Sequence, residues 1–133
     1  MIVQFKEKYK EQIWPNLDSE NKKLFKNNLF IKFLFIEKNI VKGWILLQPS
    51  KDRLLLDWIF VLNKFRKQKI GTKLLTYVKK FAKNKNFRGI SVNTGSQADW
   101  ARSFYKKNGF KQVGSVKKFF KFDKEHIFYW FNI

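Results

Sequence analysis

Cysteine is missing from this 133-residue chain, and histidine occurs once, at His126. Without thiols there are no disulfides, thiolate metal sites, iron–sulfur clusters or cysteine nucleophiles. A single imidazole argues against a zinc site and leaves any serine–histidine–aspartate triad resting on one residue. The sequence therefore predicts a function that uses no metal.

Long apolar runs are also missing, because no stretch approaches the roughly 18 residues needed to span a bilayer. The first residues, Met1–Lys6, show no basic segment followed by an apolar one, so we expect no signal peptide. The composition is 44% apolar and 19% aromatic, which disfavours disorder. We expect a soluble, cytoplasmic protein folded as one domain over residues 1–133.

Acidic residues are scarce: 10 stand against 29 basic ones, for a net charge of +19. Such an imbalance is typical of proteins with a polyanionic partner. However, 25 of the cations are Lys and only 4 are Arg, the better residue for bidentate phosphate recognition. Lys, Asn and Ile, all abundant here, have AT-rich codons. The charge alone leaves open whether it is functional or compositional.

Hydrophobic patterning in the first half predicts three antiparallel strands. The segment 1–28 is polar, with one short helix to about residue 28 capped by Asp18 or Ser19. Strands are expected at 29–37, 40–48 and 53–62, joined by turns at 38–39 and 49–52. The strand 53–62 is almost continuously apolar, which favours a central position.

The second half adds a strand–helix–strand unit and a hairpin. Apolar residues at helical spacing begin at Ile70, and a short strand follows at 88–94, so strands 53–62 and 88–94 should be parallel. A second helix starts at a capping box formed by Ser96 and Asp99 and stops at Asn108-Gly109. Strands at 110–122 and 126–133 complete a mixed α/β sheet. The aromatic residues of this tail favour core or dimer contacts over a platform for stacking bases or a wall of the acceptor pocket.

The loop 63–72 joins a buried strand to a helix start and holds four cationic side chains among its first seven residues. Free N–H groups in the first helical turn, the helix dipole and nearby cations together suit a phosphate. A solvated lysine-rich loop is the other interpretation. The glycine spacing matches neither a Walker A loop nor the dinucleotide fingerprint.

Two motifs resemble those of the GCN5-related N-acetyltransferase (GNAT) family. The segment Val61–Leu75, with Arg66-Lys67-Gln68-Lys69-Ile70-Gly71 at its centre, resembles the acetyl-CoA-binding motif Arg/Gln-x-x-Gly-x-Gly/Ala. The segment Ala101–Phe110 resembles the second motif, Ala-x-x-Phe/Leu-Tyr-x-Lys-x-Gly-Phe. The resemblance covers about residues 29–133. It implies that residues 1–28 form helices on the acceptor side, that 53–94 form the acetyl-CoA-binding βαβ core, and that 97–133 hold the second motif and the last strands.

The resemblance further implies that strands 53–62 and 88–94 splay apart, leaving backbone groups at Phe60, Val61 and Leu62 to hold the pantetheine arm. It implies contacts to acetyl-CoA from the loop and helix start, namely Arg66, Lys67, Gln68, Lys69, Ile70, Gly71 and Thr72. Lys69 departs from the family pattern, because Gly is usual there and lets the backbone approach the pyrophosphate. Ala98 replaces the usual Asn of the second motif, and Ser96, Gln97 or Asn93 are candidates to supply that contact.

Tyr105 matches the general-acid tyrosine of the family, whereas without the motif it would be interpreted as a core aromatic. Asp57 is the single carboxylate in the apolar strand 53–62 and is a candidate general base or a structural partner of a lysine. His126 titrates in a suitable range, but a packing role is favoured.

We expect an enzyme that moves the acetyl group of acetyl-CoA to a primary amine by direct attack, with acetyl-CoA as donor substrate and no metal. The acceptor stays open: a peptide or protein amine, a small amine, or aminoacyl-tRNA, acidic or linked to RNA. The rival function is a basic RNA- or ribosome-binding module with a degenerate acyltransferase site, supported by the charge, by Lys69 and by the missing asparagine at Ala98. The protein is expected to be a monomer or homodimer without membrane association.

Overall fold

The chain forms one seven-stranded sheet with helices on both faces, in a computed structural model that describes residues 1–121 and 124–133. The strands are β1 (Ile2–Gln4), β2 (Ile31–Glu37), β3 (Ile40–Ser50), β4 (Arg53–Val61), β5 (Gly89–Gly95), β6 (Lys111–Lys117) and β7 (Glu125–Asn132). The helices are α1 (Lys10–Ile13), α2 (Ser19–Lys26), α3 (Ile70–Asn84) and α4 (Asp99–Lys107), with short 3-10 turns at 7–9, 14–16 and 63–65. No described helix is both long and apolar enough to cross a membrane.

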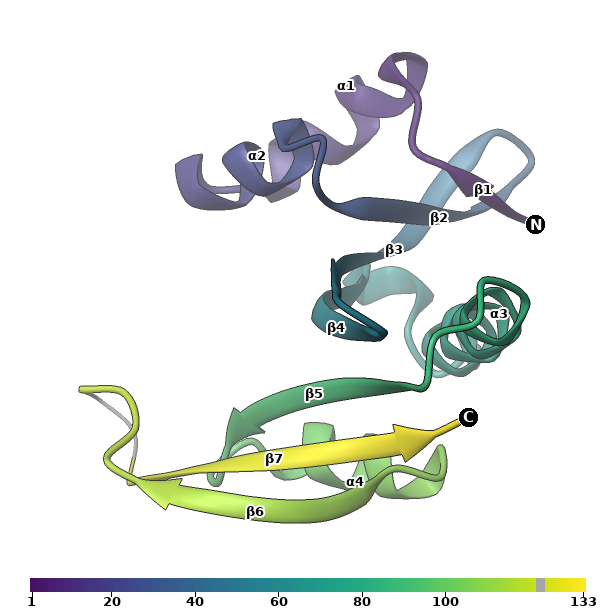
Figure 1. The fold of residues 1–133 in the computed structure, drawn as a ribbon. Coiled ribbons are helices and arrows are strands. Elements are labelled where there is room, and N and C mark those ends of the chain that lie inside the picture. The colour runs from purple at the N-terminus through teal and green to yellow at the C-terminus, as the bar shows by residue number, and fades with distance from the viewer. Residues whose placement is uncertain (122–123) are drawn as a thin grey trace.

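The sheet order is β1-β2-β3-β4-β5-β7-β6, antiparallel except at the β4–β5 pair. This arrangement confirms the mixed α/β fold, the meander and the parallel βαβ unit expected from the sequence. Figure 1 shows that β4 and β5 diverge, dividing the sheet into two halves. The divergence follows from the pairing, which covers three residues, Arg53–Leu55 with Gly89–Ser91, and then stops.

Two apolar cores cover the two faces of the sheet. Amphipathic α3 buries Ile70, Leu74 and Val78 on one face, where α4 adds Ala101 and Tyr105. On the other face the N-terminal segment packs Ile13 and Phe25 against the central strands, including Trp44, in a mainly aromatic cluster. Asp18 caps α2 as expected, its carboxylate accepting the Asn21 N–H at 2.8 Å.

Several expected boundaries are wrong. The first 28 residues contain a strand, β1, which pairs with β2 because Ile2 and Val3 can cover its apolar edge. The turn expected at 49–52 is formed by Lys51 and Asp52 alone, since Pro49 and Ser50 still belong to β3.

The last hairpin is also shorter than expected. The strand predicted over 110–122 ends at Lys117, and Phe119 and Phe120 are about half exposed instead of forming core. Phe122 and Asp123 lie outside the described residues. The other aromatic residues of the tail differ in burial: Tyr129 is fully buried, whereas Phe128, Trp130 and Phe131 are partly buried.

Candidate functional site

A cavity of about 1100 Å³ lies where β4 and β5 separate. Four segments line it: the end of β4, the loop into α3 with the first turn of that helix, the end of β5, and α4. At the closed end the two strands are held together by Arg53, whose guanidinium donates to the Ser91 hydroxyl at 2.6 Å. The splay that the motif resemblance implies is present, and it opens a cavity large enough for a ligand between two halves of one sheet.

A β-bulge turns the end of β4 away from β5. Leu47 of β3 pairs with Leu56, but the preceding Leu46 pairs with Trp58, so Asp57 has no opposite residue. A bulge bends its strand and re-aims the side chain of the extra residue. Gly43 of β3 is required just beyond it, because a Cβ there would lie 2.7 Å from the Phe60 carbonyl oxygen.

The bulge and the splay leave one edge of β4 facing the cavity. The Val61 carbonyl points to this edge, where it accepts the Arg66 Nε–H at 3.0 Å. Within an extended residue the N–H and C=O point to the same side of the strand, so the Val61 N–H faces the cavity as well. Successive residues alternate between the two edges of the strand, so the N–H and C=O of Ile59 also face the cavity. The Leu62 N–H instead donates to the Lys42 carbonyl at 2.9 Å and is already used.

The loop before α3 places cations around a helix start. Lys67 and Lys69 both have left-handed backbone, with φ of 68° and 60°, and Lys69 is the N-cap residue without a side-chain cap. The N–H groups of the first turn, from Ile70 to Thr72, therefore have no helical partner and carry the positive end of the helix dipole. Left-handed backbone at Lys69 explains why glycine suits this position.

Gly71 lies on the first turn of α3, directly opposite α4. A Cβ at this position would lie 3.2 Å from two ring carbons of Phe104. A side chain at Gly71 would therefore crowd the Phe104 ring, so glycine favours close packing between the two helices, in addition to any approach of backbone to a phosphate. Both residues line the cavity.

Tyr105 extends from α4 into the cavity wall and is 5% exposed. Its ring packs against Phe104, Phe110 and Tyr129 with centroids 5.4–6.0 Å apart. Burial raises the pKa of the Tyr105 phenol above its ordinary value, so the hydroxyl stays protonated throughout the neutral range. Helix α4 has Ala98 as its N-cap residue and no side-chain cap, so the capping box expected from Ser96 and Asp99 is wrong.

Asp57 lies at the mouth of the same cavity. Its side chain is exposed, yet the surrounding apolar wall raises the pKa of the carboxyl by desolvation. None of the ion pairs among the described residues includes Asp57. A structural partnership with a lysine, one of the two interpretations of this residue, therefore has no support in the structure.

Asn93, on β5, is the cavity-lining residue among the three candidates to replace the missing asparagine of the second motif. Its Oδ1 lies 2.7 Å from His126 Nε2. His126 is buried on β7 and stacks on Phe119, so it packs beside the site and does not line it.

Most of the site residues expected from the sequence meet at this cavity. It is lined by Asp57, Phe60, Val61, Arg66, Lys67, Lys69, Ile70, Gly71, Thr72 and Tyr105, but not by Leu62, Gln68 or Ser96. Trp100 of α4 also lines the cavity, with its side chain 68% exposed, and it was not among the site residues expected from the sequence. An aromatic side chain at helical spacing gives no signal that separates a cavity wall from a core position.

Comparison with known proteins gives a consistent result. The family model described as an acetyltransferase (GNAT) domain matches residues 30–112. The "Probable N-acetyltransferase camello" of Xenopus laevis is 32% identical over 99 residues, which is 72% of this chain and 45% of that protein. The chain thus spans about half the length of the curated relatives it matches.

Two solved structures share the fold over nearly the whole chain. A GNAT family acetyltransferase from Elizabethkingia anophelis with acetyl-CoA bound has a TM-score of 0.83 at 21% identity, covering 100% of this chain and 97% of that one. An acetyltransferase of the GNAT family from Staphylococcus aureus Mu50 has a TM-score of 0.78 at 26% identity, covering 99% and 98%.

Proposed function

This chain belongs to the GCN5-related N-acetyltransferase family, and we propose that it transfers the acetyl group of acetyl-CoA to a primary amine by direct attack. One observation carries the proposal: the free edge of β4 and the cationic start of α3 line the same cavity. The first suits an extended amide-containing arm, and the second suits a pyrophosphate. The solved relative with acetyl-CoA bound supports the same donor.

The residues present fit acetyl-CoA. The pyrophosphate would be held by the N–H groups of Ile70, Gly71 and Thr72, with Lys67 and Lys69 supplying charge. The Val61 N–H, nearer than Ile59 to the loop before α3, would pair with the pantetheine arm. Arg66 is folded back onto the end of β4, 5.6 Å over the Phe60 ring, so it supports the strand end as well as the anion site.

When bound, acetyl-CoA supplies a thioester activated toward amines. The chain contributes the remaining groups. The Ile59 N–H, further along β4 from the anion site, is positioned to donate to a carbonyl oxygen held against β4, stabilising charge that develops on it. Asp57 accepts a proton from the attacking amine, and desolvation makes its carboxylate a stronger base. The Tyr105 hydroxyl holds a proton for a sulfur anion in the cavity.

The acceptor stays a prediction: peptide or protein amine, small amine, or aminoacyl-tRNA. The rival function, RNA or ribosome binding with a degenerate acyltransferase site, has its support in the net charge of +19. Lys69 supports it less, since its backbone is left-handed, the conformation that glycine adopts most readily. The cytoplasmic location and the monomer or homodimer state likewise stay predictions.

The test combines donor binding with thiol release. Acetyl-CoA should raise the melting temperature, and thiol should be released with one class among amine, peptide and aminoacyl-tRNA panels. Tyr105→Phe keeps the ring contacts and removes only the hydroxyl, so kcat should fall about 10²-fold with little change in donor affinity. Tyr77→Phe, on the exposed side of α3 and outside the cavity, is the matched control.

Stabilisation by RNA with none by acetyl-CoA would overturn the proposed function in favour of the rival. Equal kcat for wild type and Tyr105→Phe would remove the general-acid role while leaving donor binding intact. If the acceptor is a nucleic acid, its binding should weaken steeply with salt through counterion release, whereas a small amine should show little salt dependence.

A further inference from the structure

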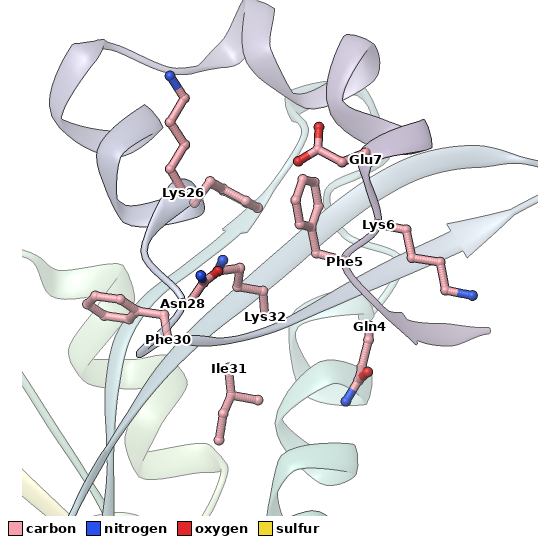
Figure 2. Close-up of a pocket in the computed structure, with 10 residues that line it drawn as sticks. Gln4, Phe5, Lys6, Glu7, Lys26, Asn28, Phe30, Ile31 and Lys32 are labelled. Carbon is pink, nitrogen blue, oxygen red and sulfur yellow. The ribbon is translucent and has the colours of Figure 1, made fainter.

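A second cavity, of about 450 Å³, lies on the opposite side of β4 from β5, against the outer strands of the sheet (Figure 2). It is formed by the end of β1 and the turn after it, the end of α2 with the loop that follows, and the start of β2. It shares no lining residue with the larger cavity. It is therefore a separate compartment, to which the proposed acetyl transfer assigns no role.

Three phenylalanines, Phe5, Phe25 and Phe30, give this otherwise polar cavity its apolar walls. Phe5 and Phe25 meet edge to face with ring centroids 5.4 Å apart, and Phe30 forms the opposite side. Phe25 is 1% exposed and also contacts Trp58, so its ring closes the cavity toward β4. The Phe5 N–H donates to the Lys32 carbonyl at 3.0 Å, which fixes the end of β1 on the start of β2. These walls are built by packed elements, so the cavity has a defined shape.

Lys32 is the polar group around which the cavity is built. Its side chain is half-buried, its Nζ lies 5.8 Å from the Phe5 ring centroid, and Figure 2 shows its amine reaching toward Asn28. It takes part in none of the salt bridges found among the described residues. Burial lowers the pKa of this ammonium, while the charge of Glu7 acts in the other direction. An anion inside the cavity would give the Lys32 ammonium a charge-assisted hydrogen bond.

The charges around Lys32 restrict the anion. Lys6 and Lys26 also line the cavity, and Figure 2 shows their amines directed outward, where they make the entrance positive. Glu7 places one negative charge above the Phe5 ring. The three lysines outnumber Glu7, so the cavity attracts an anion, and Glu7 disfavours negative charge on its own side. An anion with an apolar body would therefore place its charge at Lys32 and its apolar part beside the rings.

We propose that this cavity is a binding site for a small carboxylate carried on an aromatic or aliphatic body, held by Lys32 between Phe5 and Phe30. The volume is within the range of small-molecule sites. The carboxylate would lie against Lys32 and Asn28, and the apolar part would fill the space beside the rings. The site is independent of the donor cavity, so its occupancy does not depend on the acetyl-transfer proposal.

The test is a titration of the full chain with benzoate and with benzamide, its neutral analogue, followed by ¹H–¹⁵N NMR. Benzoate should shift the amide signals of Phe5, Ile31 and Lys32, with a dissociation constant at least about tenfold below that of benzamide, since one charge-assisted contact is worth about 1.4 kcal/mol or more. Saturating acetyl-CoA should leave benzoate binding unchanged.

Two variants separate the charge from the shape. Lys32→Gln should weaken benzoate about tenfold and leave benzamide unchanged, whereas Lys23→Gln, an exposed lysine of α2 outside the cavity, should change neither. Phe30→Ala should weaken both probes, because it removes a wall. Equal affinity for the two probes, an unchanged benzoate affinity in Lys32→Gln, displacement by acetyl-CoA or the absence of a saturable shift would each overturn the proposal.

Discussion

Replacing Lys69 by glycine should stabilise the protein although it removes a side chain. Lys69 has φ of 60° and ψ of 23°, a conformation that costs an L-residue about 1–2 kcal/mol. Glycine removes this strain but adds about 0.4–1 kcal/mol of unfolded-state entropy. The balance is a gain of about 0.5–1 kcal/mol in the free energy of unfolding, which corresponds to roughly 2–5 °C in Tm for a chain of this size.

Three variants isolate the backbone from the charge. Lys69→Gly and Lys69→Ala remove the same charge, so the difference between them reports the relief of left-handed strain less the unfolded-state entropy of glycine. Lys69→Gly should be more stable than Lys69→Ala, whereas Lys80→Gly, at an exposed interior position of α3, should lose about 1 kcal/mol. Thermal unfolding measured at equal protein concentration is the assay. If Lys69→Gly is no more stable than Lys69→Ala, the strain argument is refuted.

The Lys69→Gly and Lys69→Ala variants also show how Lys69 affects the binding of acetyl-CoA. If the ammonium compensates for the missing glycine, both variants should raise the KM for acetyl-CoA, because both remove the charge. If the Lys69 Cβ instead hinders the approach of the backbone to the pyrophosphate, Lys69→Gly should lower the KM and Lys69→Ala should not. The comparison therefore tests both explanations of this departure from the family motif.

Three further predictions concern the cavity. Asp57→Asn should abolish most amine acetylation, yet it should raise the free energy of unfolding at neutral pH slightly, by no more than about 0.5 kcal/mol. The reason is that the pKa of Asp57 is raised in the folded state, so its ionisation destabilises the fold. Thermal scans against pH should show this gain vanish below the unfolded pKa of 3.8. Gly71→Val should weaken acetyl-CoA binding, measured by calorimetry, more than Gly71→Ala does. If adding Phe104→Leu to Gly71→Val restores binding, the loss came from crowded helix packing and not from a blocked approach of backbone to phosphate. Arg66→Ala should raise the acetyl-CoA KM about tenfold in steady-state assays with kcat little changed, and an unchanged KM would place the anion site elsewhere.

The general architecture could be predicted because it follows from periodicity and order along the chain. Alternating or continuous apolar segments predicted the meander, and the change to helical spacing at Ile70 predicted the crossover helix. The family motifs then brought the β4 end, the α3 start and α4 together. β1 could not be predicted in this way, since three residues show no period and gain their strand conformation only by pairing with β2.

Contacts between distant segments set the parts of the site that could not be predicted. The pair of Asn93 and His126 joins β5 to β7 across 33 residues, and neither residue alone indicates the other. The second cavity depends on how the end of β1 meets β2 and α2. No local pattern reports such an arrangement, because the register of each strand is decided by all its neighbours.

Asp57 shows how a tertiary feature explains an anomaly already visible in the sequence. A carboxylate in an apolar strand would normally be buried and costly. The bulge between the pairs Leu46–Trp58 and Leu47–Leu56 removes that conflict, because the extra residue leaves the alternation of the strand and reaches the cavity mouth. The same bulge starts the divergence of β4 from β5. The fold therefore exposes the carboxylate and frees the β4 edge through one irregularity, so a variant that removed the bulge should lose both the base and the donor site together.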